Sequence, residues 1–128
     1  MRHTLKRNEV LRGRKNFDLL FQRGERRSGS VIRCLILRAP SDAPPRVIAG
    51  FAVPKTVPRA VDRNRIKRYL RESYRLHKHL LAPERLTTGL TILFLYARGK
   101  RSPEGLPSYH VVEQDMIELL RYLGGDAA

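Results

Sequence analysis

The segment from residue 63 to 81 constrains the fold most, because it carries apolar side chains on one side of a helix and cations on the other. At about 100° per residue, one arc collects Ile66, Tyr69, Leu70, Ser73, Tyr74, Leu76, His77, Leu80 and Leu81. The opposite arc collects Arg63, Asn64, Lys67, Arg68, Arg71, Arg75 and Lys78. This pattern predicts an amphipathic helix with its apolar side on a core. Pro58 and Pro83 are expected to bound it, with Asp62 as its N-cap.

The cations of this helix favour binding of a polyanion over stability. Arg63 and Arg65 are expected in the first turn, where the helix dipole disfavours a cation by about 0.3–1 kcal/mol. Glu72 is placed to pair with Arg68 and Arg75. A solvated charged face is the ordinary interpretation of such a run. The clustering of one sign at the unfavourable helix end points instead to phosphate, which helix N-termini and arginine forks both bind.

Length and charge support the same interpretation. The chain has 128 residues, which suits one domain over 1–128. Its net charge of +14 is typical of a nucleic-acid binder whose affinity falls with salt. No apolar run reaches the roughly 20 residues that span a bilayer, and the N-terminus lacks an apolar stretch of secretory type. Cys34 is the one cysteine, so an internal disulfide is impossible and a reduced, cytoplasmic protein without membrane partners is expected.

The hydrophobic pattern predicts an order of helix, strand, strand, helix, strand, helix. Besides the central helix, the elements are a helix over 14–23, strands over 30–38, 46–53 and 90–98, and a last helix from Ser108 to Gly124. A further short strand near 26–28 stays open. The strand over 90–98 is apolar on both faces and is therefore expected in the middle of its sheet. The result is an α/β (α+β) sandwich of helices on one sheet. Residues 1–10 and the basic loop 99–107 are expected to be mobile.

A catalytic constellation is not visible in the sequence. No histidine has a cysteine partner at zinc spacing, and His77 and His79 are expected on a solvated helix side. Glu113, Asp115 and Glu118 are expected on the solvated face of the last helix. There is no nucleophile elbow and no phosphate-cradling glycine loop. We therefore assign no catalytic and no metal-binding residue, expect no small-molecule substrate, and do not expect the chain to hydrolyse a substrate alone.

The sequence AVDRNRIKRYLRESYR resembles the RNR signature of the bacterial ribonuclease P protein subunit. The matching positions are Arg63, Asn64, Arg65, Lys67, Arg68 and Arg71. Leu11, Phe17, Leu20, Phe21 and Gly24 resemble the opening helix of this family, Val53 and Lys55 its strand end before the signature, and ILFLYARGK its last strand. Pro58 stands where many members carry glycine, and Thr56 where they often carry a second lysine. An acidic residue usually opens the last strand, where this chain has Thr88-Gly89-Leu90.

The resemblance implies a four-stranded mixed sheet with three helices, a fold like the second domain of a small-subunit ribosomal protein. The signature helix would form a left-handed crossover between parallel strands, against the usual preference. The resemblance also implies that the partners are a large catalytic RNA and precursor tRNA, whose 5′ leader the two subunits remove. The RNA would perform the chemistry with Mg²⁺ that it holds itself, so the protein alone would be inactive.

The implied binding residues form two groups. The folded RNA would be contacted by Arg63, Asn64, Arg65, Lys67, Arg68, Arg71 and Arg75. The leader strand would lie in a cleft between the first helix and the sheet, near Phe17, Phe21, Arg33, Lys55 and Arg59. The two phenylalanines are either stacking surfaces for bases or plain core, and Arg33 is either a phosphate contact or an exposed strand residue; both pairs of alternatives stay open.

Two other functions fit parts of the sequence. A ribosomal-type protein that orders RNA without a role in cleavage would have the same composition, but it does not need the aromatic face of the first helix. A DNA-binding regulator would need a second helix close before residues 63–78. The strand RVIAGFAV stands there instead, which argues against a helix-turn-helix.

Overall fold

The computed structural model describes residues 9–11, 13–39, 46–81, 89–97 and 105–124. Its elements follow the predicted order, and the strand left open near 26–28 is present as β1. They are α1 (Arg14–Arg23), β1 (Glu25–Ser28), β2 (Ile32–Arg38), β3 (Val47–Ala52), α2 (Ala60–His77), a 3₁₀-helix (Lys78–Leu81), β4 (Leu90–Tyr96) and α3 (Tyr109–Leu123). The predicted α+β class, with three helices and one four-stranded mixed sheet, is confirmed.

The sheet has the strand order β1-β2-β4-β3. β2 pairs antiparallel with β1 and β4, whereas β3 and β4 are parallel. β4 lies between two strands, as its apolar sequence predicts, and five of its seven residues are buried. Leu93 and Phe94, which point to opposite faces of the sheet, are both fully enclosed. α2 connects the parallel neighbours β3 and β4. The left hand of this crossover stays a prediction.

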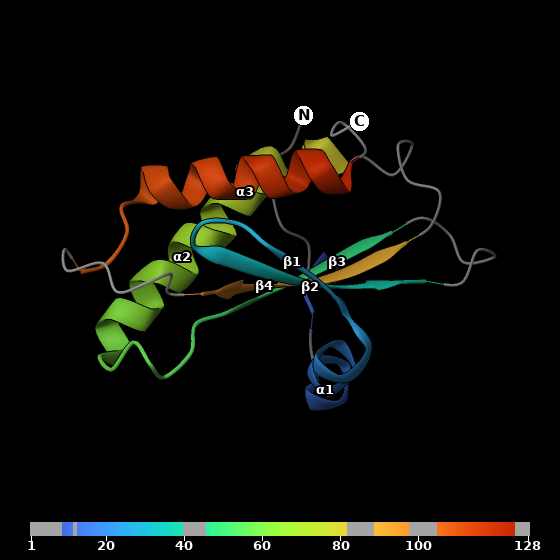
Figure 1. Cartoon of the computed structure of the whole chain (residues 1–128), viewed down its shortest axis with the longest axis horizontal. Coiled ribbons are helices and arrows are strands. Elements are labelled where there is room, and N and C mark those ends of the chain that lie inside the picture. The colour runs from blue at the N-terminus through green and yellow to red at the C-terminus, as the bar shows by residue number, and fades with distance from the viewer. Residues whose placement is uncertain (1–8, 12, 40–45, 82–88, 98–104, 125–128) are drawn as a thin grey trace.

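Helices cover both faces of the sheet (Figure 1). α2 and α3 lie together on one face and α1 lies on the other. Side chains of β2 enter the cores on both faces of the sheet, because successive side chains of a strand point to opposite faces. Cys34 and Ile36 belong to the larger core under α2 and α3, while Leu35 belongs to a smaller core with Leu20 of α1 and Leu93 of β4.

The start of α2 differs from the prediction. Arg59, in extended conformation, is the N-cap, and no side chain caps the helix there. Asp62 lies within the first turn, with its Oδ2 3.9 Å from Nε of Arg59. The expected N-cap was therefore wrong, and Arg63 lies at the end of the first turn instead of its start. A carboxylate in the first turn suits the helix dipole, so the cationic helix is less disfavoured than its sequence indicates.

Asp115 also departs from the prediction. It was expected on a solvated face of α3, but it is 4% exposed and accepts hydrogen bonds from the backbone N–H groups of Ser30, Val31 and Ile32. Glu113 is half-buried, whereas Glu118 is exposed as expected. The last helix begins where it was expected, and Ser108 is its N-cap, since Oγ of Ser108 accepts from Val111 N.

Residues 9 and 10 contact the rest of the fold. Residues 1–8 of the expected mobile stretch lie outside the described residues, as do residues 99–104 of the expected flexible loop. Val10 forms a parallel bridge with Ala49 of β3, and Nζ of Lys78 lies 2.9 Å from Oε2 of Glu9. Residues 9 and 10 thus contact β3 and Lys78, and the expected mobility of residues 1–10 stays a prediction. None of the helices in the described part of the chain is long and apolar enough to cross a membrane.

Candidate nucleic-acid interface

The two sides of α2 separate apolar from cationic residues as predicted. Its buried residues are Ile66, Leu70, Ser73 and Tyr74. Its exposed polar residues include Asn64, Arg65, Lys67, Arg68 and Arg71. Among the residues that the structure describes, no ion pair is recorded for the four exposed cations of this set. Their positive charge therefore faces solvent, where an anion can reach it.

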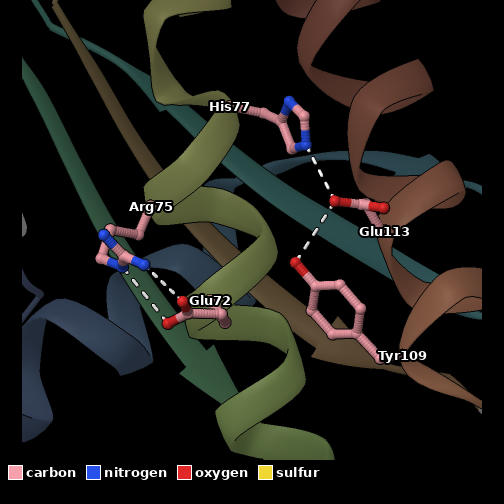
Figure 2. Close-up of polar contacts among 5 residues, drawn as sticks. All are labelled: Glu72, Arg75, His77, Tyr109 and Glu113. Atoms are coloured by element: carbon pink, nitrogen blue, oxygen red, sulfur yellow. Dashed lines mark hydrogen bonds and ion pairs between the residues drawn. The ribbon is translucent and has the colours of Figure 1, made fainter. Parts of the chain in front are cut away.

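Arg75 and Lys78 differ from those cations because carboxylates hold them. Nε of Arg75 donates to Oε2 of Glu72 at 3.2 Å, and a second contact joins the other arms of the same two side chains (Figure 2). Glu9 holds Lys78. The hydrogen bond from Arg75 lowers the pKa of Glu72, which keeps this carboxylate charged. Arg75 is therefore a weaker candidate for RNA contact than the exposed cations, because its guanidinium is already paired with Glu72.

Arg63 has a local partner that the sequence did not reveal. Its Nη1 donates to the carbonyl oxygens of Val57 and Pro58, at 2.8 and 2.9 Å. These residues belong to the connector between β3 and α2, and Val57 is buried in the larger core. The guanidinium therefore fixes the connector against α2, and its remaining N–H groups are left for other contacts.

A groove of about 340 Å³ runs beside the first two turns of α2. It is lined by Phe17, Phe51, Ala52, Val53, Arg63, Asn64 and Lys67. These residues come from α1, from the end of β3 and from α2, so three elements distant in sequence form one surface. The guanidinium carbon of Arg71 lies 5.7 Å from the ring centroid of Phe51. Aromatic and aliphatic walls meet cations here, which is the composition of a single-strand nucleic-acid site.

The sheet extends this groove toward Arg33. Arg33 of β2 pairs in register with Leu95 of β4, and Leu95 pairs with Ala52 of β3. Residues paired across strands share a face of the sheet, so an exposed arginine lies in line with the groove. Arg33 and Phe17 are therefore on the same side of the sheet, the side that α1 covers.

The other predicted cleft residues are placed differently. The described lining of the groove does not include Phe21, whose side chain is 49% exposed, nor Lys55 or Arg59, which are exposed in the connector. Phe17 is half-buried and packs on the smaller core as well as lining the groove. The position of Phe17 is compatible with both interpretations, and contact of any of these residues with RNA stays a prediction.

A hydrogen-bonded chain between α2 and α3 was missed from the sequence. Nε2 of His77 lies 3.1 Å from Oε2 of Glu113, which also accepts from the hydroxyl of Tyr109 at 3.3 Å (Figure 2). The prediction of a solvated His77 was wrong, because its ring is half-buried against α3. Burial, with the Glu113 carboxylate as a second cause, raises the pKa of Tyr109 to about 12. The helical spacing of Tyr109 and Glu113 was the one available signal.

The described side chains of the site suit binding of an anion. In the described ranges, no three histidine, cysteine, aspartate or glutamate side chains gather as metal ligands. That Mg²⁺ is held mainly by an RNA partner stays a prediction. What the site offers is exposed cations and an aromatic groove, the features of an α+β protein that binds a nucleic acid.

The chain belongs to the ribonuclease P protein family. Its residues 5–124 match the family described as Ribonuclease P. It is similar to the ribonuclease P protein component of Chlorobium phaeobacteroides, with 33% identity over 92% of this chain and 86% of the relative. The protein component of Desulfovibrio desulfuricans is 39% identical over 94% of this chain and 86% of the relative.

Solved structures agree with this membership. The fold is similar to the RNase P protein from Thermotoga maritima, with a TM-score of 0.69, 25% identity, and coverage of 89% of this chain and 96% of that one. It is also similar to the Staphylococcus aureus RNase P protein, with a TM-score of 0.63, 19% identity, and coverage of 89% and 94%. The resemblance first carried by the RNR signature is thereby confirmed.

Proposed function

We propose that this chain binds the RNA of ribonuclease P through the exposed face of α2 and the 5′ leader of precursor tRNA through the groove. The catalytic RNA, with the Mg²⁺ that it holds, then performs the cleavage, and the protein alone is inactive. The setting is the reducing cytoplasm, where the buried thiol of Cys34 stays free. Membership in the family supports the two RNA partners.

The observation that carries the proposal is the groove itself. Phe17 supplies a half-buried aromatic surface, the nearly buried Phe51 closes the wall behind it, and Arg63, Asn64 and Lys67 supply positive charge and hydrogen bonds along one edge. Stacking on an aromatic ring is tolerant of base identity because every base has a flat face. Such a site suits a protein that grips the leaders of many different precursor tRNAs.

The exposed cations of α2 support the second contact. Arg65 and Arg68 project from the helix beyond the groove, and no carboxylate neutralises them among the described residues. Arginine forks bind phosphate oxygens in pairs, which suits the backbone of a folded RNA. One helix can thus lie against the catalytic RNA while its first turns face the leader. The ribosomal-type alternative does not account for the groove.

Reconstitution tests this function. Purified protein is mixed with transcribed ribonuclease P RNA and precursor tRNA at low Mg²⁺, and 5′ maturation is followed on gels. Cleavage by the mixture, with none from either component alone under the same conditions, supports the proposal. Cleavage by the protein without the RNA would refute the assigned division of labour, and an RNA whose activity is unaffected by the protein would refute the assisting role.

A further inference from the structure

A second hollow lies on another side of α2, away from the leader groove. It has a volume of about 380 Å³ and is lined by Arg68, Tyr69, Glu72, Leu76 and Tyr109. Four of these residues come from α2 and Tyr109 comes from the start of α3. At about 100° per residue, Tyr69, Glu72 and Leu76 are turned well away from Lys67, which lines the groove, so the helix has a hollow on each flank. Arg68 lies between the two hollows, one turn after Asn64. We call the second hollow the α2–α3 notch.

The aromatic walls of the notch are fixed in position. The rings of Tyr69 and Tyr109 meet edge to face, with centroids 5.6 Å apart and planes at 77°. The hydroxyl of Tyr109 donates to Glu113, which His77 also contacts from the end of α2 (Figure 2). These contacts of Glu113 with His77 and Tyr109 thus hold the Tyr109 ring in place. The notch therefore has preformed flat surfaces instead of mobile side chains that could fill it.

The polar groups of the notch favour a nucleotide. Arg68 is exposed at its edge and is followed by Arg71 on the next turn. Glu72 is charged and paired with Arg75, but a carboxylate has about four acceptor positions and one arginine fork fills two. An acceptor is therefore left beside an aromatic wall and a free cation. A base with an exocyclic amino group, joined to a phosphate, matches all three.

We propose that the α2–α3 notch takes one unpaired nucleobase of the bound RNA. The base stacks on the face of one of the two rings, Tyr69 or Tyr109, with the other ring standing edge-on beside it. It donates its amino group to Glu72, while Arg68 holds the adjoining phosphate. Adenine, cytosine and guanine fit this chemistry, whereas uracil lacks the amino donor. This inference rests on the proposed function, and it adds a base-reading contact to a helix whose other cations contact phosphates only.

The test combines affinity with nucleotide-level probing. Tyr69→Leu and Tyr109→Leu remove the ring but keep apolar volume, and Leu76→Glu places a second negative charge in the notch without emptying it. Tyr122→Ala is the matched control, since Tyr122 is an exposed tyrosine of α3 that packs under Arg27. Binding to ribonuclease P RNA and to precursor tRNA is measured separately, and base reactivity toward dimethyl sulfate is mapped in each complex. Thermal unfolding by circular dichroism identifies any variant that does not fold.

The notch variants should bind the RNA that supplies the base about 5- to 150-fold more weakly, as expected for loss of one stacked base. The same variants should expose one adenine, cytosine or guanine that the wild type protects, with guanine followed at its N7, and Tyr122→Ala should leave it protected. The RNA in which this nucleotide lies is the source of the base.

Two results separate this inference from the function beneath it. If the wild type binds both RNAs but the folded notch variants match it in affinity and footprint, the notch is not a base site and the proposed function stands. If the wild type binds neither RNA, the proposed function is wrong, and the base site that rests on it is wrong as well. If an acidic peptide bound at the notch and no nucleotide were protected there, the proposal would also be overturned.

Discussion

A β-carbon added to Gly29 would lie 2.2 Å from Oδ1 of Asp115, so the absence of a side chain at residue 29 is what admits this carboxylate. Once admitted, Asp115 accepts from Ser30, Val31 and Ile32, at 2.8, 2.9 and 2.8 Å. The turn before β2 is thereby tied to the middle of α3. A buried charge is tolerated because three N–H groups replace its water.

Removing this carboxylate should destabilise the fold. We expect Asp115→Ala to lower the free energy of unfolding by about 3 kcal/mol or more, since three N–H groups lose their acceptor and an unsatisfied buried group costs about 1–3 kcal/mol. Urea unfolding followed by circular dichroism measures the change. Glu118→Ala is the control, because Glu118 is exposed on the same helix. A loss no larger than that of the control would show that the contact does not stabilise the turn.

The elements and the amphipathic α2 could be predicted because their signals are local. Ile66, Leu70 and Tyr74 recur at helical spacing, and residues 90–96 are apolar except for Thr91. Asp115 could not be predicted, because its three partners are more than 80 residues away. An acidic residue on the polar side of a predicted helix gives the same sequence pattern whether its carboxylate contacts water or backbone N–H groups.

The site shows the same division between local and distant signals. The exposed cations follow from the period of α2, and the aromatic face of α1 indicated Phe17. The groove and the α2–α3 notch bring residues of separate elements together, such as Phe17 with Lys67 or Tyr69 with Tyr109. Nothing in the spacing of one segment specifies these distances, because they are set by how the helices pack on the sheet.

Loss of two exposed cations of α2 should weaken RNA binding broadly. Arg65→Ala with Arg68→Ala removes two groups placed for phosphate, so the slope of log K against log salt should fall by about 1 for each lost contact. Filter binding over a range of salt concentrations measures the slope. Replacing Arg23 and Arg121 by alanine gives a control with the same net charge, since both lie exposed on other helices. An equal slope in wild type and in the α2 variant would exclude this face as the RNA contact.

Arg63 should act through shape as well as charge. Arg63→Lys keeps the positive charge but cannot supply the planar fork, so the connector loses hydrogen bonds to Val57 and Pro58. We expect a loss of about 1–2 kcal/mol in unfolding free energy, as for charged hydrogen bonds that are partly exposed, together with weaker binding of the leader. Arg65→Lys serves as the control because Arg65 is exposed. If both substitutions leave stability unchanged, the connector is held by other contacts.

Phe17 should distinguish precursor from mature tRNA. Phe17→Leu keeps most of the packing on Leu20 and Leu35 but removes the ring from the groove. The holoenzyme should then bind precursor tRNA more weakly by about 1–3 kcal/mol, the contribution of one stacked base, while binding of mature tRNA is unchanged. Phe21→Leu is the matched control, since that ring is exposed outside the described lining of the groove. Equal losses for the two tRNAs would assign Phe17 to the core alone.

Stability should decrease at alkaline pH, in part through Tyr109. Burial and the Glu113 carboxylate raise its pKa from 10.0 to about 12 in the folded protein, so folding favours the protonated phenol. Its contribution is complete below the unfolded pKa of 10.0 and is lost as the pH rises toward about 12. Burial also raises the pKa of Tyr74 and of the Cys34 thiol, so part of the alkaline loss belongs to them.

Tyr109→Phe isolates this contribution because it removes the titrating group and keeps the ring. Urea unfolding measured from neutral pH to about pH 12 should show a shallower decline for this variant than for the wild type. The absorbance of ionised tyrosine is followed over the same pH range. In the variant, the ionisation step at the highest pH among the accessible tyrosines should be absent. Tyr122→Phe is the control at an exposed tyrosine and should keep the wild-type decline. Identical declines in wild type and Tyr109→Phe would mean that folding does not raise the pKa of Tyr109.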